Sequence, residues 1–288
     1  MTMTPTLHTF IQALQTPDIS FTTLADARPA TEAGGIPQLM RTTRFAEAEI
    51  VWRGRQWLLS LPLSPAALAA VERTASQAGR LNTEWLAEYR ILRGELLWVD
   101  AEEHPQTCDL VLQHLPAGRS FAEALLTEPA ERLLAGLDAL QSALRELGFS
   151  HNNLRPDNLR WSGGRFIPLR YHDARFGTSD GDAEAFEALR RRVRKAGGPM
   201  QVSDIEADYA PLRRLTGHRW TSHVFEGLVC VEDDEGFGFV DTDNNPVIAS
   251  HFVWAGDFRE GRAEVETSGG MGLIDRNGNY VIPPEYEI

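Results

Sequence analysis

A repeat of 34 residues near the end of the sequence constrains the fold more than any other feature of this chain. Each copy opens at a tryptophan, Trp220 or Trp254, and continues through an apolar run, a glycine and a polar turn. The other residues that recur with this spacing are Glu226 and Glu260, Gly238 and Gly272, Asp241 and Asp275, Ile248 and Ile282, and Phe252 and Tyr286. A unit this short cannot bury an apolar face alone, so repeated units stack on one another.

Within each copy the pattern indicates a small β meander. The runs EGLVCV and EGRAEV are typical of strands, and the turns DTDNN and DRNGN are typical of β hairpins. We therefore expect residues 218–288 to form two equivalent meanders, with Trp220 and Trp254 in equivalent, largely buried positions. Asp241, Asp243 and Asp275 are predicted to shape the turns and not to bind calcium, because the carboxylate density of a calcium loop is missing.

The wording of the second copy, FREGRAEVETSGGMGLIDRNGNYVIPPEY, closely resembles the WG repeat, also called KWG. One departure is that the name-giving Trp-Gly pair is Phe237-Gly238 in the first unit and Met271-Gly272 in the second. A large apolar side chain before the glycine keeps the packing role. The residues expected to pack the repeats are Trp220, Trp254, Phe237, Met271, Phe252 and Tyr286.

The first two thirds of the chain mix helical and strand patterns, which favours an α+β fold. The expected elements are an amphipathic helix over 7–14, a hairpin turning at 53–54, a helix over 65–79, a helix over 83–94, strands over 95–100 and 108–115, a long helix over 130–147 and a last helix over 182–195. Residues typical of helix ends support these bounds. Ser64 precedes a first-turn proline, Asn82 can cap the helix over 83–94, and Gly148 follows the leucine-rich helix over 130–147.

The residues HNNLRPDN at 151–158 resemble the catalytic loop of protein kinases, H-R-D-L-K-P-x-N. The order of the expected elements from about residue 40 to 195 also resembles that fold. The resemblance assigns a place to each matching residue: His151 to the structural histidine, Asn153 to the catalytic aspartate, Arg155 to a phosphate-contacting lysine, and Asn158 and Asp173 to the two metal ligands. It also places Glu88 at the glutamate that pairs with a lysine in the family.

The positions that carry out phosphoryl transfer depart from the family. Lys195 is the only lysine in the sequence, so no lysine stands on the earlier strands to contact ATP phosphates. Gly34 and Gly35 match a glycine-rich phosphate loop poorly. The neutral amide of Asn153 is too weak a base to accept a proton at neutral pH. Only about 40 residues separate Asp173 from the repeats, too few for the usual substrate-holding helices.

These departures favour a non-catalytic binding or scaffold protein, a reduced pseudokinase module joined to two WG repeats, with a protein partner that the sequence does not identify. We expect no cofactor and no bound metal; Asn158 and Asp173 would be the ligands if a metal were held. Two alternatives stay open. One is a kinase-fold transferase that moves a phosphoryl or AMP group and uses arginine in place of lysine. The other is a structural protein that binds nothing specific.

The fold class expected is α+β, with a kinase-like bilobal N-terminal domain and a small all-β C-terminal domain. Its expected parts are an N-terminal helix and loop over 1–39, the kinase-like domain over 40–196, a linker over 197–217 and the repeats over 218–288. The long apolar run of a membrane span and a secretory signal are both missing. Two distant cysteines, Cys108 and Cys230, suit a reducing compartment, so a cytoplasmic protein without a membrane partner is expected.

Charge narrows the class of partner. The net charge is −13, and residues 218–288 contribute −10 of it, from 14 acidic residues and 4 arginines. An acidic surface steers cations in and polyanions away, so a cationic or neutral protein surface is expected in preference to nucleic acid. The basic cluster from Arg190 to Lys195 is expected to be the solvated end of a helix.

Overall fold

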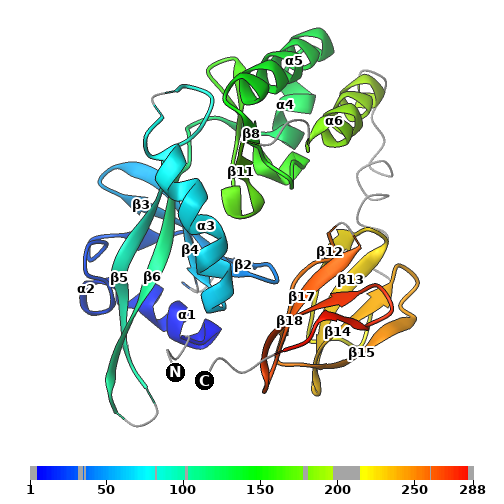
Figure 1. Ribbon diagram of the computed structural model, residues 1–288. Coiled ribbons are helices and arrows are strands. Elements are labelled where there is room, and N and C mark those ends of the chain that lie inside the picture. Colours follow the sequence, from blue (N-terminus) through cyan, green and yellow to red (C-terminus); the bar gives the residue numbers. More distant parts are fainter. Residues whose placement is uncertain are drawn as a thin grey trace. The chain divides into compact units, whose positions relative to one another are not determined.

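The computed structural model describes residues 5–31, 35, 37–81, 83–100, 103–177, 181–196, 215–259 and 261–284. The chain divides into two compact units. The first consists of Met1–Arg41 and Phe45–Met200, and the second of Thr42–Arg44 and Gln201–Ile288. The first unit mixes helices with antiparallel sheets, and the second is built of strands in its described part (Figure 1).

The main sheet of the first unit has six antiparallel strands. They are β1 (Arg28–Pro29), β2 (Leu39–Arg41), β3 (Phe45–Trp52), β4 (Arg55–Pro62), β5 (Tyr89–Val99) and β6 (Pro105–His114). The order is β1-β3-β4-β6-β5, and β2 also pairs with β3. The predicted hairpin is confirmed: β3 and β4 join through Arg53 and Gly54, which both have positive φ, at 50° and 72°, as a two-residue hairpin turn requires.

Apolar side chains cover both faces of this sheet. On one face, Ala48, Ile50 and Leu59 pack with helix α1 (Leu7–Gln15), whose first turn is capped by Thr6; the short helix α2 (Pro17–Ser20) follows it. On the other face, Phe45 and Val111 pack with helix α3 (Pro65–Ala78) and with the helical part of the unit. The predicted start of α3 is confirmed, because Ser64 Oγ accepts a hydrogen bond from the N–H of Ala67 at 3.2 Å.

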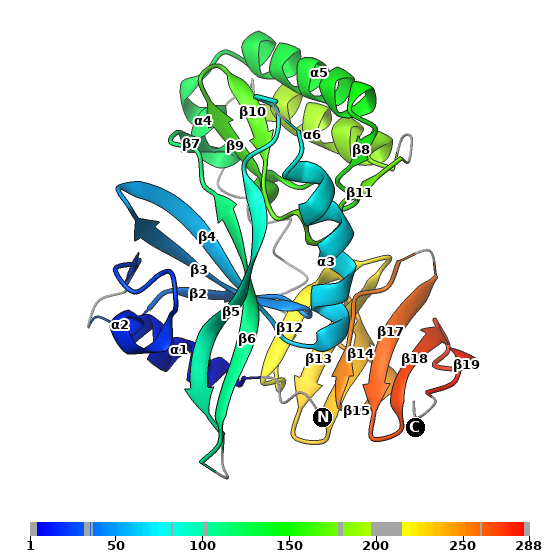
Figure 2. The same cartoon turned by 60° about the vertical axis from the view of Figure 1, so that its left-hand side comes forward.

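The helical part consists of helices α4 (Phe121–Thr127), α5 (Ala130–Glu146) and α6 (Ala183–Ala196), which lie together beyond the sheet in Figures 1 and 2. Short strands accompany them: β7 (Arg119–Ser120), β8 (Phe149–Ser150), β9 (Leu159–Ser162), β10 (Arg165–Pro168) and β11 (Arg175–Phe176). Two 3-10 turns, η1 (Pro156–Asn158) and η2 (Tyr171–Asp173), complete it. The predicted leucine stripe of α5 is buried from Leu133 to Leu144, and Gly148 ends the helix with φ of 61°.

The helix expected over 83–94 is wrong. Residues from Tyr89 onward form strand β5, which pairs with β6 over nearly its whole length. Glu88 therefore precedes a strand and stands on no helix, and its carboxylate lies 3.5 Å from Arg90 and 3.9 Å from Arg55. The role of ion-pair glutamate that the kinase resemblance gave to Glu88 does not fit this position. Asn82, the expected cap, lies outside the described residues.

The expectation that the basic cluster from Arg190 to Lys195 is solvated is wrong for Arg190. Helix α6 forms as predicted, but the Arg190 side chain is buried. It donates from Nε to Asp138 Oδ1 at 2.8 Å and from Nη1 to Glu187 Oε1 at 2.8 Å, and a further bond reaches Gln141. Arg190 thus holds α6 against α5 and does not belong to a solvated cationic end.

The second unit contains two four-stranded antiparallel sheets, as the repeat predicts. The first has β12 (Trp220–Phe225), β13 (Leu228–Asp233), β14 (Gly236–Asp241) and β15 (Pro246–Phe252). The second has β16 (Trp254–Ala255), β17 (Arg262–Thr267), β18 (Gly270–Asp275) and β19 (Tyr280–Ile282). The central strands β13 and β17, and likewise β14 and β18, begin and end at an offset of 34 residues.

Of the expected linker, residues 197–214 lie outside the described residues, and so does Tyr286. No helix in the described ranges has the length and apolar character needed to span a membrane. Cys108 and Cys230 are both free thiols, and burial raises the pKa of Cys108 to about 12.

Candidate functional site

The loop that resembles a kinase catalytic loop runs from strand β8 to turn η1, and backbone contacts hold its first half. Both carboxylate oxygens of Asp182 accept backbone N–H bonds, from His151 at 2.5 Å and from Asn152 at 2.8 Å. The ring of His151 is fully buried and donates from Nε2 to the carbonyl of Leu169 at 2.7 Å. Burial lowers the pKa of His151, so the ring is neutral and acts as a structural donor.

The structure brings together Asn153, Asn158 and Asp173. Asn153 donates from Nδ2 to Asp173 Oδ2 at 3.1 Å, and Asn158 donates from Nδ2 to the carbonyl of Asn153 at 2.7 Å. The carbonyl of Arg155 accepts the N–H of Asn158 at 3.0 Å, which closes turn η1. In the described residues, no group of three His, Cys, Asp or Glu side chains is arranged to hold a metal ion.

A buried ion-pair cluster lies next to this loop. It consists of Glu47 on strand β3 together with Arg170 and His172, which lie before and within turn η2. Arg170 donates from Nε to Glu47 Oε2 at 2.6 Å, and His172 donates from Nε2 to Glu47 Oε1 at 2.7 Å. The Glu47 side chain has no exposed surface. A fully desolvated carboxylate is tolerated only when charges and donors compensate it, and here both of its oxygens are compensated.

Further contacts fix the two partners of Glu47. The backbone N–H of Arg170 donates to Gln113 Oε1 at 2.6 Å, and its Nη1 donates to the carbonyl of Asp157 at 2.8 Å. Arg170 has φ of 60°, a left-handed conformation that costs free energy for a residue other than glycine. The ring of His172 stacks on Phe45 with the ring centres 3.8 Å apart, and its Nδ1 lies 3.2 Å from the hydroxyl of Tyr89.

The cluster has a defined pH dependence. Burial alone would raise the pKa of Glu47, but the charge of Arg170 and the hydrogen bond and charge of His172 lower it from 4.5 to about 2. The carboxylate therefore binds protons more weakly in the folded chain than in the unfolded chain. Its stabilisation is complete above pH 4.5 and is lost as the pH falls from 4.5 toward 2.

We expect the free energy of unfolding of the wild-type protein to decrease by about 3 kcal/mol more than that of Glu47→Gln over this acid range, since each pKa unit is worth about 1.4 kcal/mol. Denaturant titrations of both proteins at a series of pH values measure the difference. Parallel pH profiles for the two proteins would contradict this account of Glu47.

Sequence reasoning missed this cluster. Glu47 and Glu49 stand in the same apolar strand, FAEAEIVW, with the same local pattern, yet Glu47 is buried and Glu49 is exposed. The partners of Glu47 lie more than a hundred residues further along the chain, at separations of 123 and 125. The local sequence distinguishes the two positions only in that Ala46 and Ala48 flank Glu47, whereas Ala48 and Ile50 flank Glu49.

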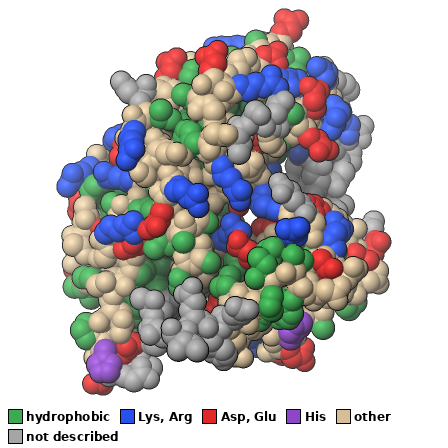
Figure 3. Space-filling view, in the orientation of Figure 1, with side chains coloured by type: hydrophobic (Ala, Val, Ile, Leu, Met, Phe, Trp, Pro, Cys, Tyr) green, Lys and Arg blue, Asp and Glu red, His purple; other side chains and the backbone are tan. Residues whose placement is uncertain are grey.

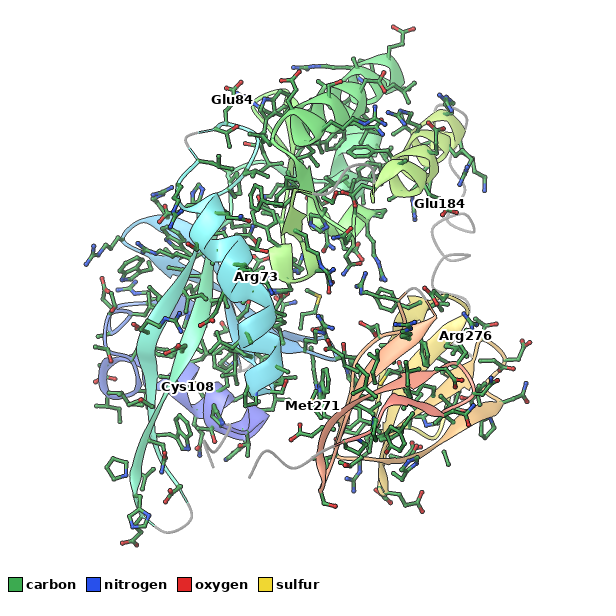
Figure 4. All side chains as sticks on the ribbon, in the orientation of Figure 1. Arg73, Glu84, Cys108, Glu184, Met271 and Arg276 are labelled. Atoms are coloured by element: carbon green, nitrogen blue, oxygen red, sulfur yellow. The ribbon has the colours of Figure 1, made fainter. Side chains whose placement is uncertain are left out.

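The predicted packing residues of the repeats occupy related places. Trp220 pairs with Glu232 and Trp254 with Glu266, which is the same register after the 34-residue offset. Trp254 is buried, whereas Trp220 is only half-buried. Phe237 and Phe252 are buried. Met271, on strand β18, is 37% exposed and does not follow the expectation of a packed position (Figure 4).

Equivalent residues face the same way in the two meanders, so opposite faces of the two sheets meet where they stack. The face of the first sheet that carries Leu228, Phe237 and Phe239 forms one core with the face of the second sheet that carries Ala263, Val265 and Ile274. Phe239 meets Phe258 edge-on, with ring centres 4.7 Å apart. The opposite face of the first sheet carries Val229, Val231 and Val240, the residues equivalent to Ala263, Val265 and Ile274, in a separate cluster. Each sheet therefore has two distinct faces that recur with the repeat.

The turn aspartates form matching loops, as predicted. Asp241 Oδ1 accepts the N–H groups of Asp243 at 2.9 Å and Asn245 at 2.8 Å. Asp275 Oδ1 accepts those of Asn277 and Asn279, both at 2.9 Å. These hydrogen bonds lower the pKa of both carboxyl groups. The carboxylates thus bond to their own loop, in the manner of Asx turns.

Comparison with known proteins bears on the second unit. A family model for the WG containing repeat matches residues 237–270 and 271–287. A comparison with curated proteins gave no match. The two matched segments begin at Phe237 and Met271, the residues that stand in the place of the repeat's tryptophan. The match over residues 237–287 therefore supports the WG repeat in the C-terminal part of this chain.

Proposed function

We propose that the chain is a non-catalytic binding or scaffold protein, in which a degenerate pseudokinase module is joined to WG repeats that mediate a protein–protein interaction. The order of elements supports the first half of the proposal. The hairpin β3–β4, helix α3, strands β5 and β6, helix α5 and the loop at 151–158 follow one another as they do in the kinase resemblance. The correction at residues 83–94 improves this order, because it leaves one helix between the hairpin and the next two strands.

The observation that carries the proposal is the Glu47 cluster. In protein kinases the phosphates and metal ions of ATP lie between a lysine on the sheet and the asparagine and aspartate ligands of the other part. In this chain Glu47 of the sheet contacts Arg170 and His172 directly, at 2.6 and 2.7 Å. If the kinase resemblance holds, these side chains fill the region that the phosphates would need.

The electrostatics of the cluster oppose nucleotide binding as well. Glu47 has a pKa of about 2 and is ionised at neutral pH, so a phosphate brought next to it would meet a like charge in a poorly solvated place. Arg170 is already paired with this carboxylate. Exchanging that pair for a phosphate would leave one oxygen of the buried Glu47 carboxylate without its cation, at a cost of several kcal/mol.

We expect no binding of Mg-ATP or Mn-ATP by calorimetry, no shift of the thermal unfolding midpoint, and no transfer of radiolabel to protein or small acceptors. Asn153→Asp should remain inactive, because restoring the carboxylate restores neither the lysine nor the open phosphate site. The informative control is Asp173→Ala. Micromolar binding that vanishes in this variant, or any transferred label, would favour the kinase-fold transferase instead.

The binding half of the proposal rests on the repeats. Stacked β repeats present extended surfaces, and a chain without a catalytic centre has no other evident use for them. Affinity capture with the full chain should enrich a protein partner, and removal of residues 218–288 should abolish the enrichment. A full chain that enriches nothing would favour the structural protein that binds nothing specific.

A further inference from the structure

The turn of the β3–β4 hairpin carries a fixed pair of tryptophans. The indole rings of Trp52 and Trp57 lie 5.9 Å apart at 61°, and both side chains are buried. Trp52 donates from Nε1 to Asp26 Oδ1 at 2.8 Å, and Trp57 donates from Nε1 to the carbonyl of Trp52 at 3.3 Å. Both indole N–H groups are thus satisfied, and the rings form a rigid base.

Three arginines stack on this base. The guanidinium of Arg53 lies 4.4 Å from the ring centre of Trp52, and that of Arg55 lies 4.9 Å from the ring centre of Trp57. Arg90 lies within reach of both rings, at 5.8 and 5.6 Å. Cation–π contacts of this kind restrict long side chains that would otherwise be mobile. We call Arg53, Arg55 and Arg90 the arginine patch.

The positive charge of the patch is only partly neutralised. Glu88 lies 3.9 Å from Arg55 and 3.5 Å from Arg90, which is longer than a good charged hydrogen bond. Arg53 makes no ion pair within the described ranges. His114, whose ring meets Trp57 edge-on, is also affected: burial and the charge of Arg55 lower its pKa, against the opposing effect of Glu88. Arginine side chains, blue in Figure 3, lie over this hairpin at the left of the view.

This geometry selects oxyanions. A guanidinium whose face rests on an indole keeps its N–H edge available for two parallel bonds to a carboxylate. Binding to nucleic acid would add stacking of bases on exposed aromatic faces, but Trp52 and Trp57 are buried and already stacked by the arginines.

We propose that the arginine patch is a docking site for an acidic peptide segment of a partner protein, with two or more closely spaced carboxylates. This site lies on the first unit and is separate from the acidic repeats, which favour the opposite charge. It goes beyond the proposed function and does not depend on whether the loop at 151–158 is catalytic.

The test is fluorescence anisotropy of a labelled oligoglutamate peptide with the full-length protein at low and moderate salt. We expect salt-sensitive binding that weakens about tenfold for each arginine removed, the effect of one charged hydrogen bond. Arg53→Ala with Arg55→Ala is the main variant. Arg73→Ala is the matched control, because Arg73 is an exposed arginine on α3 (Figure 4) and belongs to neither the hairpin nor the strand that carries the patch.

A second variant, Arg53→Lys with Arg55→Lys, keeps the charge and removes the planar guanidinium groups, so it should lose part of the affinity. It also provides a test of the patch if the alanine variant fails to fold. Absence of binding to wild type, or an equal loss in Arg73→Ala, would overturn the proposal. Tighter binding of single-stranded DNA than of the peptide would also overturn it and would indicate a nucleic-acid surface. Nucleotide binding at the kinase-like loop would leave these outcomes unchanged, so the two proposals fail separately.

Discussion

Replacing Glu47 with glutamine should lower the free energy of unfolding of the first unit by about 3–5 kcal/mol, the usual cost of removing one partner from a buried ion pair. The substitution preserves the shape of the side chain but leaves Arg170 without a compensating charge. Arg170 is held by its Nε bond to Glu47 and by its bond to the carbonyl of Asp157. Its left-handed backbone conformation adds strain that these contacts, together with the bond from its backbone N–H to Gln113, offset.

Glu49→Gln is the matched control, since Glu49 lies two residues away on the same strand and is exposed. It should change the free energy of unfolding by less than about 0.5 kcal/mol. Calorimetric melting can resolve the transitions of the two units, and only the first unit should respond. Equal effects of the two substitutions would show that the Glu47 cluster contributes little.

A double variant separates pairing from burial. The double variant Glu47→Leu with Arg170→Met removes both charges and replaces them with apolar groups. A large part of the stability that Glu47→Gln loses should therefore return. If the double variant is as unstable as Glu47→Gln, then His172 or the strained backbone of Arg170 carries the effect, and the ion pair does not.

Local chemistry allowed several elements of the first unit to be predicted from the sequence. The turn at Arg53 and Gly54, the cap at Ser64 and the stop at Gly148 depend only on a few neighbouring residues. Their outcomes agree with the structure because no distant contact competes with them.

The segment 83–94 shows where local reasoning fails. Its apolar residues include Trp85, Leu86, Tyr89, Ile91 and Leu92, a spacing that suits a helix as well as a strand. Pairing with β6 decided the outcome, through contacts such as Ile91 with Val111. Tertiary context overrode a helical pattern of ordinary propensity.

The residues of the candidate site also divide into those that the sequence predicted and those that it did not. The sequence placed His151, Asn153, Asn158 and Asp173 together through a motif, and the hydrogen bonds join Asn153 to both Asn158 and Asp173. The Glu47 cluster could not be foreseen, because it joins Glu47 to residues more than a hundred positions further along the chain. In the arginine patch, Arg90 is the member that comes from outside the hairpin residues 52–57. Whether an acidic residue on a strand is buried depends on what packs over it, which a single sequence does not state.

The repeat offers a matched pair of positions, Phe237 and Met271, at which truncation to alanine should change the free energy of unfolding by very different amounts. Phe237→Ala should lower the free energy of unfolding of the second unit by about 3–5 kcal/mol, the usual range for a buried phenylalanine. Phe237 is only 6% exposed, packs in the core shared by the two sheets and meets the ring of Trp220 at 6.3 Å. Truncation to alanine would remove contacts with this core and with the ring of Trp220. Gly238, the next residue, has no side chain that could fill the space.

Met271 is the equivalent residue 34 positions later, and Met271→Ala should cost less than about 1 kcal/mol. Its side chain is 37% exposed, and Ile282 on the adjacent strand is 57% exposed. Arg262 and Glu264 stand where the first sheet has the buried Leu228 and Cys230, so this face carries charges where its counterpart is apolar. Polar outer faces are typical of the last unit in a stack. Calorimetric melting of both variants measures the contrast. A cost for Met271→Ala as large as that for Phe237→Ala would mean that this face is covered in solution, and that the second repeat does not end the stack.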